Sequence, residues 1–272
     1  NTFYFRSGKK CCCTFICEHG SLYGIVSSRI DENGFERKRN FMIQISNLSK
    51  KYGETVVFSD LNYTFENACI YGLVGRNGAG KTTLLNILSN YDKNYTGVIS
   101  IDGEKMNKVD YLDMPVAYAM DQPSFFNELT IYENLLLIAS SRKIKKQEAF
   151  DKIERILDGL GLKKYENYSP LELSKGTMQR LNNACAMIQE EKITIFDEPF
   201  SGLDPVQMKL LENVIVEFHK KEKGIYIISS HDIECLQNVC DKCLLLHNGQ
   251  IREINMEEVD REEIAKILSE GE

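Results

Sequence analysis

The feature that most constrains this chain is a glycine-rich loop that fits G-x-x-x-x-G-K-[ST] at every fixed position, Gly75-Arg76-Asn77-Gly78-Ala79-Gly80-Lys81-Thr82. A short continuous apolar run, residues 68–74, precedes the loop, and a helical pattern follows it from Lys81 to about residue 90. Such an apolar run is typical of a strand buried on both faces. Glycine turns also arise by chance, but a preceding strand and a following helix are the context that this motif requires.

The loop predicts a nucleotide site. Glycines let the backbone wrap around a phosphate so that successive N–H groups point inward, and the following helix adds its positive N-terminal end. In such a loop Lys81 reaches the β- and γ-phosphates of the nucleotide, and the Thr82 hydroxyl binds Mg²⁺.

Two adjacent carboxylates form a second candidate element. The apolar stretch at residues 193–196 predicts a strand, and Asp197 and Glu198 follow it directly. An acidic residue at such a strand end can hold Mg²⁺ opposite the phosphate loop, while its neighbour polarises the attacking water as a general base. Taken alone, the pair fits an ordinary strand-to-turn junction equally well.

The order of apolar patterns indicates an α/β layered domain with a helical insertion. Strand patterns occur at residues 42–48, 56–65, 68–74, 98–101, 116–120, 193–196, 225–229 and 242–246. Between residues 123 and about 190 every periodic stretch is helical, at 131–142, 147–160 and 175–189. Two further helices are expected near residues 205–223 and 233–239.

With these elements in order, residues 42–250 resemble the ATP-binding cassette family, the motor subunits of ABC transporters. The signature motif of the family is similar to Leu173-Ser174-Lys175-Gly176-Thr177-Met178-Gln179-Arg180, and Ser201-Gly202-Leu203-Asp204 matches the loop that crosses to a dimer partner. The resemblance implies an ABC ATP-binding domain over residues 42–272. Its fold would be a P-loop NTPase (RecA-like) core with an antiparallel β subdomain and an α-helical subdomain inserted at about residues 123–190.

The resemblance also assigns roles to the matching residues. Contacts with ATP are implied for Tyr52, Gly75, Arg76, Asn77, Gly78, Ala79, Gly80, Lys81, Thr82, Thr83, Asp197, Ser174 and Gly176, with the ring of Tyr52 against the adenine. A Mg²⁺ site is implied at Thr82, Gln122 and Asp197. Catalytic roles are implied for Glu198 as the base, His231 as the contact of the γ-phosphate and Gln122 as the sensor of nucleotide and membrane subunit.

The signature departs from its commonest form at two positions, where Lys175 replaces a glycine and Thr177 replaces a glutamine. Ser174 and Gly176, which face the phosphate of the partner's ATP in the family, are both present. Lys175 adds a cation near a helix start, which the helix dipole slightly disfavours and a bound phosphate offsets. We expect these two replacements to affect the rate of ATP turnover more than whether the protein is active.

Residues 1–41 differ in character from the rest of the chain. Residues 1–40 carry seven basic and four acidic side chains, four of the nine cysteines lie at positions 11–17, and the first methionine is Met42. We interpret residues 1–41 as an extension of unknown role, a processed remnant, or upstream sequence that a start at Met42 excludes. The scattered cysteines suit a reducing compartment, and the pair Cys240 and Cys243 is a weak indication of zinc because Cys243 begins an apolar strand.

Composition excludes some functions. The net charge of −7 makes nucleic acid an unsuitable partner, and no apolar run approaches the roughly 18 residues of a membrane span. The resemblance implies an ATPase that works as a dimer with a second copy or a homologous subunit. It would drive a separate integral membrane permease from the cytoplasmic inner face of the cell membrane. The chain most resembles the ATP-binding subunits of bacterial exporters of drugs or antimicrobial peptides.

Two other functions stay open from the sequence. One is a soluble ABC-type ATPase without a permease, with an assembly or regulatory role. The other is a nucleotide-binding module without hydrolysis, which Glu198 disfavours. Near Gln122, the side chains of Phe125, Phe126 and Leu129 are candidates for the permease-docking groove and equally for buried helix contacts.

Overall fold

A computed structural model describes residues 3–4, 10–11, 41–109, 114–231 and 233–254 of the chain. The short strands β1 (Phe3–Tyr4) and β2 (Lys10–Cys11) pair antiparallel. The expectations for the remainder of residues 1–40 lie outside the described residues. Within the described ranges, no helix combines the length and the apolar character needed to cross a membrane.

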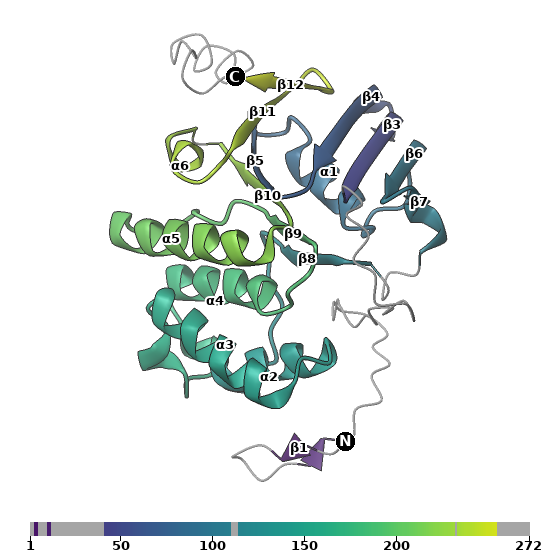
Figure 1. Ribbon diagram of the computed structural model, residues 1–272. Coiled ribbons are helices and arrows are strands. Elements are labelled where there is room, and N and C mark those ends of the chain that lie inside the picture. Colours follow the sequence, from purple (N-terminus) through teal and green to yellow (C-terminus); the bar gives the residue numbers. More distant parts are fainter. Residues whose placement is uncertain (1–2, 5–9, 12–40, 110–113, 232, 255–272) are drawn as a thin grey trace.

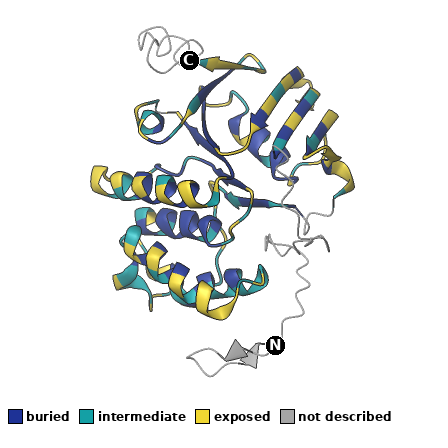
Figure 2. Cartoon of the chain, viewed as in Figure 1, coloured by how far each residue is buried: buried dark blue, intermediate teal, exposed yellow. Residues whose placement is uncertain are grey.

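A six-stranded sheet forms the centre of the molecule, with strand order β12-β11-β5-β10-β9-β8. Strands β5 (Cys69–Val74), β8 (Val116–Ala119), β9 (Ile193–Phe196), β10 (Ile225–Ser230) and β11 (Lys242–His247) are parallel, and β12 (Gln250–Ile254) is an antiparallel edge strand. Every residue of β5, β9 and β10 is buried (Figure 2), as expected of parallel strands covered on both faces. Because these strands are parallel, the loops after β5, β9 and β10 meet at one edge of the sheet.

A separate antiparallel sheet packs on one side of this core (Figure 1), with strand order β4-β3-β6-β7. Its strands are β3 (Met42–Tyr52), β4 (Thr55–Glu66), β6 (Thr96–Ile101) and β7 (Glu104–Lys105), followed by the short helix η1 (Met106–Lys108). Helix α1 (Lys81–Leu88) contributes Leu84, Leu85 and Leu88 to an apolar cluster shared with Ile43 of β3 and Phe65 of β4. Helix α1 is therefore held by apolar contacts with the antiparallel sheet as well as the core.

Three helices lie between β8 and β9 in the chain: α2 (Ile131–Ser141), α3 (Lys146–Gly159) and α4 (Lys175–Met187), with η3 (Lys163–Tyr165) and η4 (Pro170–Glu172) between the last two. A capping box of Thr130 and Glu133 begins α2. Helix α5 (Pro205–Glu222) lies beside α4 (Figure 1), and α6 (Ile233–Gln237) follows β10. The predicted α/β fold class, with its P-loop core, antiparallel β subdomain and helical insertion, is confirmed.

The bounds of individual elements differ from the sequence patterns by a few residues. Helix α1 ends at Leu88 rather than near residue 90, because Asn90 adopts a left-handed backbone with φ 61°. Strand β3 extends to Tyr52, four residues past the apolar alternation, because its pairing with β4 continues through register shifts up to the turn at Gly53. Backbone pairing rather than side-chain pattern sets this boundary.

The buried core includes Phe41, one residue before the boundary expected from the sequence. The Phe41 side chain is buried in the cluster around α1, and Lys192 Nζ lies 5.0 Å from the centre of its ring. Phe41 therefore belongs to the core that β3 begins.

We expect a chain that starts at Phe41, after an added initiator, to unfold at the temperature of the full chain and to hydrolyse ATP at the same rate. A chain that starts at Met42 should lose about 1–3 kcal/mol of unfolding free energy, the value of a buried phenylalanine. Urea unfolding of the two truncated chains and the full chain measures the difference. Loss of folding in both truncated chains would show that residues 1–40 are part of the domain.

Candidate nucleotide site

The glycine-rich loop between β5 and α1 has the backbone conformation that its sequence predicts. Gly78 and Gly80 have φ angles of 79° and 100°, a region that residues with a Cβ rarely adopt. A Cβ at Gly80 would lie 2.6 Å from Val57 Cγ1, and one at Gly75 would lie 2.8 Å from the carbonyl oxygen of Leu246. The loop therefore requires glycine both for its turn and for its close contact with neighbouring strands.

Helix α1 begins at Lys81, so the N–H groups of its first turn have no acceptor within the helix and can serve an anionic ligand. The Lys81 side chain is buried, and its ammonium group lies over the loop. Lys81 Nζ donates to the carbonyl oxygens of Gly75 at 2.7 Å and Arg76 at 3.4 Å. The loop thus presents a cation and backbone donors at one place, which is what a polyphosphate needs.

Asp197 follows β9 and is buried with a relative exposure of 1 %. Ser229 Oγ donates to Asp197 Oδ1 at 2.6 Å. Burial raises the pKa of the Asp197 carboxyl, and the hydrogen bond from Ser229 acts in the opposite direction. The hydroxyl of Thr82 and the carboxylate of Asp197 are hard oxygen ligands of the kind that Mg²⁺ prefers, so this pair fits the metal.

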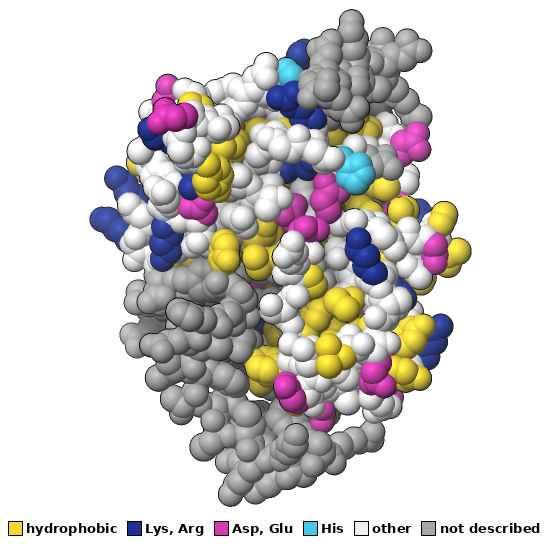
Figure 3. Space-filling view, turned by 180° about the vertical axis from the view of Figure 1, so that it is seen from behind, with side chains coloured by type: hydrophobic (Ala, Val, Ile, Leu, Met, Phe, Trp, Pro, Cys, Tyr) yellow, Lys and Arg dark blue, Asp and Glu magenta, His cyan; other side chains and the backbone are white. Residues whose placement is uncertain are grey.

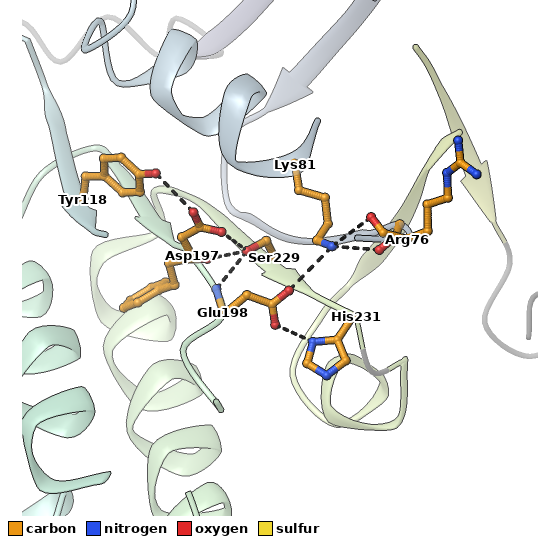
Figure 4. A network of polar contacts seen from close by, with 9 residues as sticks. Arg76, Lys81, Tyr118, Asp197, Glu198, Ser229 and His231 are labelled. Carbon is orange, nitrogen blue, oxygen red and sulfur yellow. Dashed lines mark hydrogen bonds and ion pairs between the residues drawn. The ribbon is translucent and has the colours of Figure 1, made fainter. Parts of the chain in front are cut away.

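Glu198 lies between the side chains of Lys81 and His231 (Figure 4). Its Oε1 lies 3.6 Å from Lys81 Nζ, and its Oε2 lies 2.9 Å from Nδ1 of His231, an exposed residue after β10. The backbone of Glu198 has φ 49°, and its N–H donates to Ser229 Oγ at 2.9 Å. A non-glycine residue held in this left-handed region is a recurrent feature of functional sites, where surrounding contacts hold the strain.

The structure thus brings together Lys81 and Thr82 at the start of α1, Asp197 and Glu198 after β9, and His231 after β10. The space-filling view shows acidic side chains gathered beside an exposed histidine near the middle of one face (Figure 3). Ser229 was missed by the sequence analysis, although it contacts both carboxylate residues. Ser229 lies at the carboxyl end of an apolar strand, as Asp197 does. A polar residue at such a position in the sequence could therefore be predicted as a site residue.

Tyr52 ends β3 with its ring 53 % exposed. Its hydroxyl donates to Asp92 Oδ2 at 3.1 Å, and the buried Lys50 places Nζ 4.5 Å from the ring centre and 2.6 Å from the same carboxylate oxygen. Burial opposes ionisation of Asp92, but Lys50 and the backbone N–H of Asn94 lower its pKa below the ordinary value. Lys50 and Asp92 thus hold Tyr52 in place while its ring stays open to solvent.

We expect Tyr52→Ala to weaken ATP binding about tenfold, because stacking of a base on an aromatic ring contributes about 1–3 kcal/mol. The Tyr52→Phe variant is the matched control, since it keeps the ring and removes only the hydroxyl. Equilibrium binding of ATP measures the effect. An unchanged dissociation constant in Tyr52→Ala would place the adenine elsewhere.

The signature residues begin α4. Ser174 is the N-cap of this helix, and its Oγ accepts from the backbone N–H of Thr177 at 3.2 Å and lies 2.8 Å from Thr177 Oγ1. A Cβ at Gly176 would lie 3.0 Å from the carbonyl oxygen of Gly202. Gly176 therefore lies beside the loop at residues 201–204, the other motif expected to face a dimer partner.

Gln122 lies exposed in the bend after β8. Its loop is joined to α4 because Asn182 Nδ2 donates to the carbonyl oxygen of Met120 at 2.7 Å. Gln179 of the same helix donates to the carbonyl oxygen of Glu198 at 3.2 Å. Helix α4 thus contacts both the Gln122 loop and the loop that carries the candidate base.

Within the described residues, no group of three or more His, Cys, Asp or Glu side chains has a geometry that could hold a metal. Cys240 and Cys243 are free thiols, and burial raises the pKa of Cys243 to about 12 and that of Cys240 well above its ordinary value. A buried thiol that resists ionisation is a poor zinc ligand.

Comparison with known proteins gives the family. Residues 58–201 match the family described as ABC transporter. The chain is 30 % identical to the bacitracin transport ATP-binding protein of Enterococcus faecalis, over 81 % of this chain and 71 % of that protein. It is also 30 % identical to the tungstate uptake system ATP-binding protein of Peptoclostridium acidaminophilum, over 78 % of this chain and 97 % of that protein.

Among solved structures, a dimeric bacterial ABC transporter cassette matches with a TM-score of 0.70 and 22 % identity, covering 78 % of this chain and 98 % of that one. This structural likeness supports the fold, and the sequence matches support the family. The chain therefore belongs to the ABC transporter family, as one of its ATP-binding, ATP-hydrolysing subunits.

Proposed function

We propose that this subunit powers the export of a drug or antimicrobial peptide through a separate integral membrane permease, with Mg²⁺ and ATP bound at the site around Lys81. The observation that carries the hydrolytic part is the position of Glu198 beside the phosphate loop, 3.6 Å from Lys81 Nζ. Coupling to a permease is supported by membership of the transporter family. Export is supported by the relative named for bacitracin transport, and the relative named for tungstate uptake is the reason to test the direction.

The residues of the site divide the chemistry between them. Lys81 and the N–H groups of the phosphate loop bind the β- and γ-phosphates, and Tyr52 stacks on the adenine. Thr82 and Asp197, with Gln122, would hold Mg²⁺, which screens the negative charge of the two phosphates when bound. The Glu198 carboxylate accepts a proton from water while the water oxygen bonds to the γ-phosphorus. The bond from that phosphorus to the β–γ bridging oxygen breaks, and ADP and phosphate result.

His231 orients the base. Its Nδ1 lies 2.9 Å from Glu198 Oε2, which leaves Oε1 on the side of Lys81. A carboxylate that is held at both oxygens can adopt fewer orientations. We propose that the Glu198 carboxylate is thereby held with a free lone pair toward the attacking water. We propose that the imidazole also contacts the γ-phosphate, as its exposed position after β10 allows.

The positions of Ser174 and Gly176 support a dimer. Gly176 lies beside the loop at residues 201–204, and we propose that this surface closes over the phosphate loop of a partner. A solved relative in fold is a dimeric cassette. We propose that the partner is a second copy of this chain or a homologous ATP-binding subunit.

The permease-docking surface is proposed at the loop before α2. Asn134 holds this loop in shape, since its Nδ2 donates to the carbonyl oxygens of Phe126 and Leu129 and its Oδ1 accepts from the Phe126 N–H. Phe125, Phe126 and Leu129 are all half-buried, and Phe125 packs against the helical core cluster. Phe125 therefore serves helix contacts, whereas Phe126 and Leu129 remain the docking candidates. The space-filling view shows hydrophobic side chains gathered over this helical block (Figure 3).

The test of the permease is to solubilise membranes in mild detergent, isolate this chain and identify the integral membrane protein that copurifies. We expect to find the chain at the inner face of the cell membrane, with a single permease copurifying in a fixed ratio to it. In a Phe126→Asp variant the permease should no longer copurify. A chain that stays in the membrane-free fraction with unchanged ATPase activity would instead support the alternative, a soluble ABC-type ATPase with an assembly or regulatory role. Direction is tested in cells without the chain: higher sensitivity to the peptide indicates export, and lower uptake of a nutrient indicates import.

A further inference from the structure

Tyr118 lies near the nucleotide site, and none of the roles described above involves it. Tyr118 lies on β8, directly beside Ile195 of β9, with its side chain half-buried. Its hydroxyl lies 3.4 Å from Asp197 Oδ2 and 3.0 Å from Oδ1 of Asn86 on α1. Figure 4 shows the phenol approaching the Asp197 carboxylate from β8, whereas Ser229 approaches it from β10.

The two hydroxyls divide the carboxylate between them. Ser229 Oγ donates to Oδ1 of Asp197 at 2.6 Å, and the Tyr118 hydroxyl faces Oδ2. Burying a carboxylate costs folding free energy unless hydrogen-bond donors replace the water molecules that it has lost. The single proton of the Tyr118 hydroxyl is shared between Asn86 Oδ1 and Asp197 Oδ2, so the carboxylate has a full donor on Oδ1 and a shared donor on Oδ2. Together these two contacts restrict rotation of the carboxylate plane.

Tyr118 also joins the two elements that supply the candidate Mg²⁺ ligands. Asn86 lies on α1, the helix that carries Thr82 near its start, and Asp197 follows β9. Since the phenol contacts both Asn86 and Asp197, it constrains the position of α1 relative to the end of β9. Displacement of either element would change the distance between Thr82 and Asp197.

We propose that Tyr118 is a positioning residue for the Mg²⁺ site, in that its hydroxyl holds the Asp197 carboxylate in the orientation that binds the metal. This proposal rests on the proposed Mg²⁺–ATP site. It extends that site to a side chain that does not itself touch ATP or metal.

The test measures Mg²⁺ binding without turnover. In the Glu198→Gln background, a fluorescent ATP analogue is titrated at increasing Mg²⁺, and also in EDTA. We expect Tyr118→Phe to raise the half-saturating Mg²⁺ concentration about tenfold, a usual effect of losing an outer partner of a metal ligand, and to leave binding in EDTA unchanged. The ring remains, so the variant should fold, and its melting temperature is measured alongside.

Tyr226→Phe is the matched control. Tyr226 is fully buried on β10, and its hydroxyl donates to a different carboxylate, Glu222 Oε2, at 2.6 Å. This control should lower the melting temperature and leave the Mg²⁺ requirement unchanged. If Tyr118→Phe behaves like Tyr226→Phe, the positioning role is wrong while the nucleotide site stands. If the parent protein itself binds the analogue without any response to Mg²⁺, the proposed metal site is wrong, and this proposal with it.

Discussion

Replacement of Glu198 by glutamine is expected to lower the rate of ATP hydrolysis about 10²- to 10⁴-fold, the range that a general base contributes. Glutamine has nearly the same shape, so the contact with His231 Nδ1 at 2.9 Å can be kept. An amide oxygen, however, does not accept the proton of the attacking water. Because the phosphate loop and Lys81 are unchanged, the affinity for ATP should stay within a few-fold of the parent value.

Two comparisons make this result specific. Lys81→Ala should lose ATP affinity, because it removes the cation that the loop holds 2.7 Å from the Gly75 carbonyl oxygen. Glu191→Gln is the matched control: this half-buried glutamate is paired with Arg142 at 2.9 Å and is not one of the candidate site residues, so turnover should be unchanged. ATP hydrolysis and equilibrium ATP binding are measured for all three variants. A Glu198→Gln protein with the parent rate would mean that another group is the base.

Lys81, Asp197 and Glu198 could be predicted because each lies at the end of a predicted strand or at the beginning of a predicted helix. Lys81 starts a helix after an apolar run, and Asp197 follows another apolar run, so the parallel sheet brings them to the same edge. The motif spacing carries this information because the backbone geometry of a phosphate loop leaves few alternatives.

The residues that could not be predicted depend on how elements meet. The contact between Tyr118 and Asn86, which lie 32 residues apart in the chain, requires a particular packing of β8 against α1. Lys50 meets Asp92 only because β3 runs past its apolar alternation, with shifts in its pairing to β4. The sequence around Lys50 and Tyr118 has no periodic pattern that would predict either side chain to lie beside a carboxylate. Such contacts follow from tertiary packing and not from local spacing.

A mixture of two inactive subunits is expected to recover ATPase activity, if the active unit is a dimer with shared sites. One subunit carries Lys81→Ala and lacks the cation of the phosphate loop. The other carries Ser174→Arg, which puts a long cationic side chain at the exposed start of α4. Each alone should be inactive, since in either homodimer both sites carry a lesion.

The recovery follows from how the sites are composed. In the mixed dimer, one site combines the intact loop of the Ser174→Arg subunit with the intact Ser174 and Gly176 of the Lys81→Ala subunit. The other site carries both lesions. Random pairing of equal amounts under twofold symmetry predicts about a quarter of the parent activity, provided that one intact site can turn over.

The Ser174 variant needs its own control, because Ser174 also caps α4 through the Thr177 N–H. Ser174→Ala loses the same cap, which contributes about 0.5–2 kcal/mol, but leaves the surface open to a partner. This variant should melt at a lower temperature and still hydrolyse ATP, whereas Ser174→Arg should melt similarly and be inactive. Unfolding of the Ser174→Ala variant at the assay temperature would assign the defect to the helix start and not to the interface.

The physical reason for expecting a shared site is exposure of the reaction centre. His231 is 62 % exposed, and the Glu198 carboxylate beside it is only partly covered, so a single chain leaves this side of the γ-phosphate open to water. Closure by Ser174 and Gly176 of a partner would exclude bulk water and add donors where negative charge develops in the transition state, the setting in which such donors stabilise it most. The Glu198→Gln subunit should accordingly dimerise when ATP is added, as measured by sedimentation. ATPase activity of a chain that stays monomeric, unaffected by Ser174→Arg, would contradict the shared site and favour a self-contained nucleotide switch.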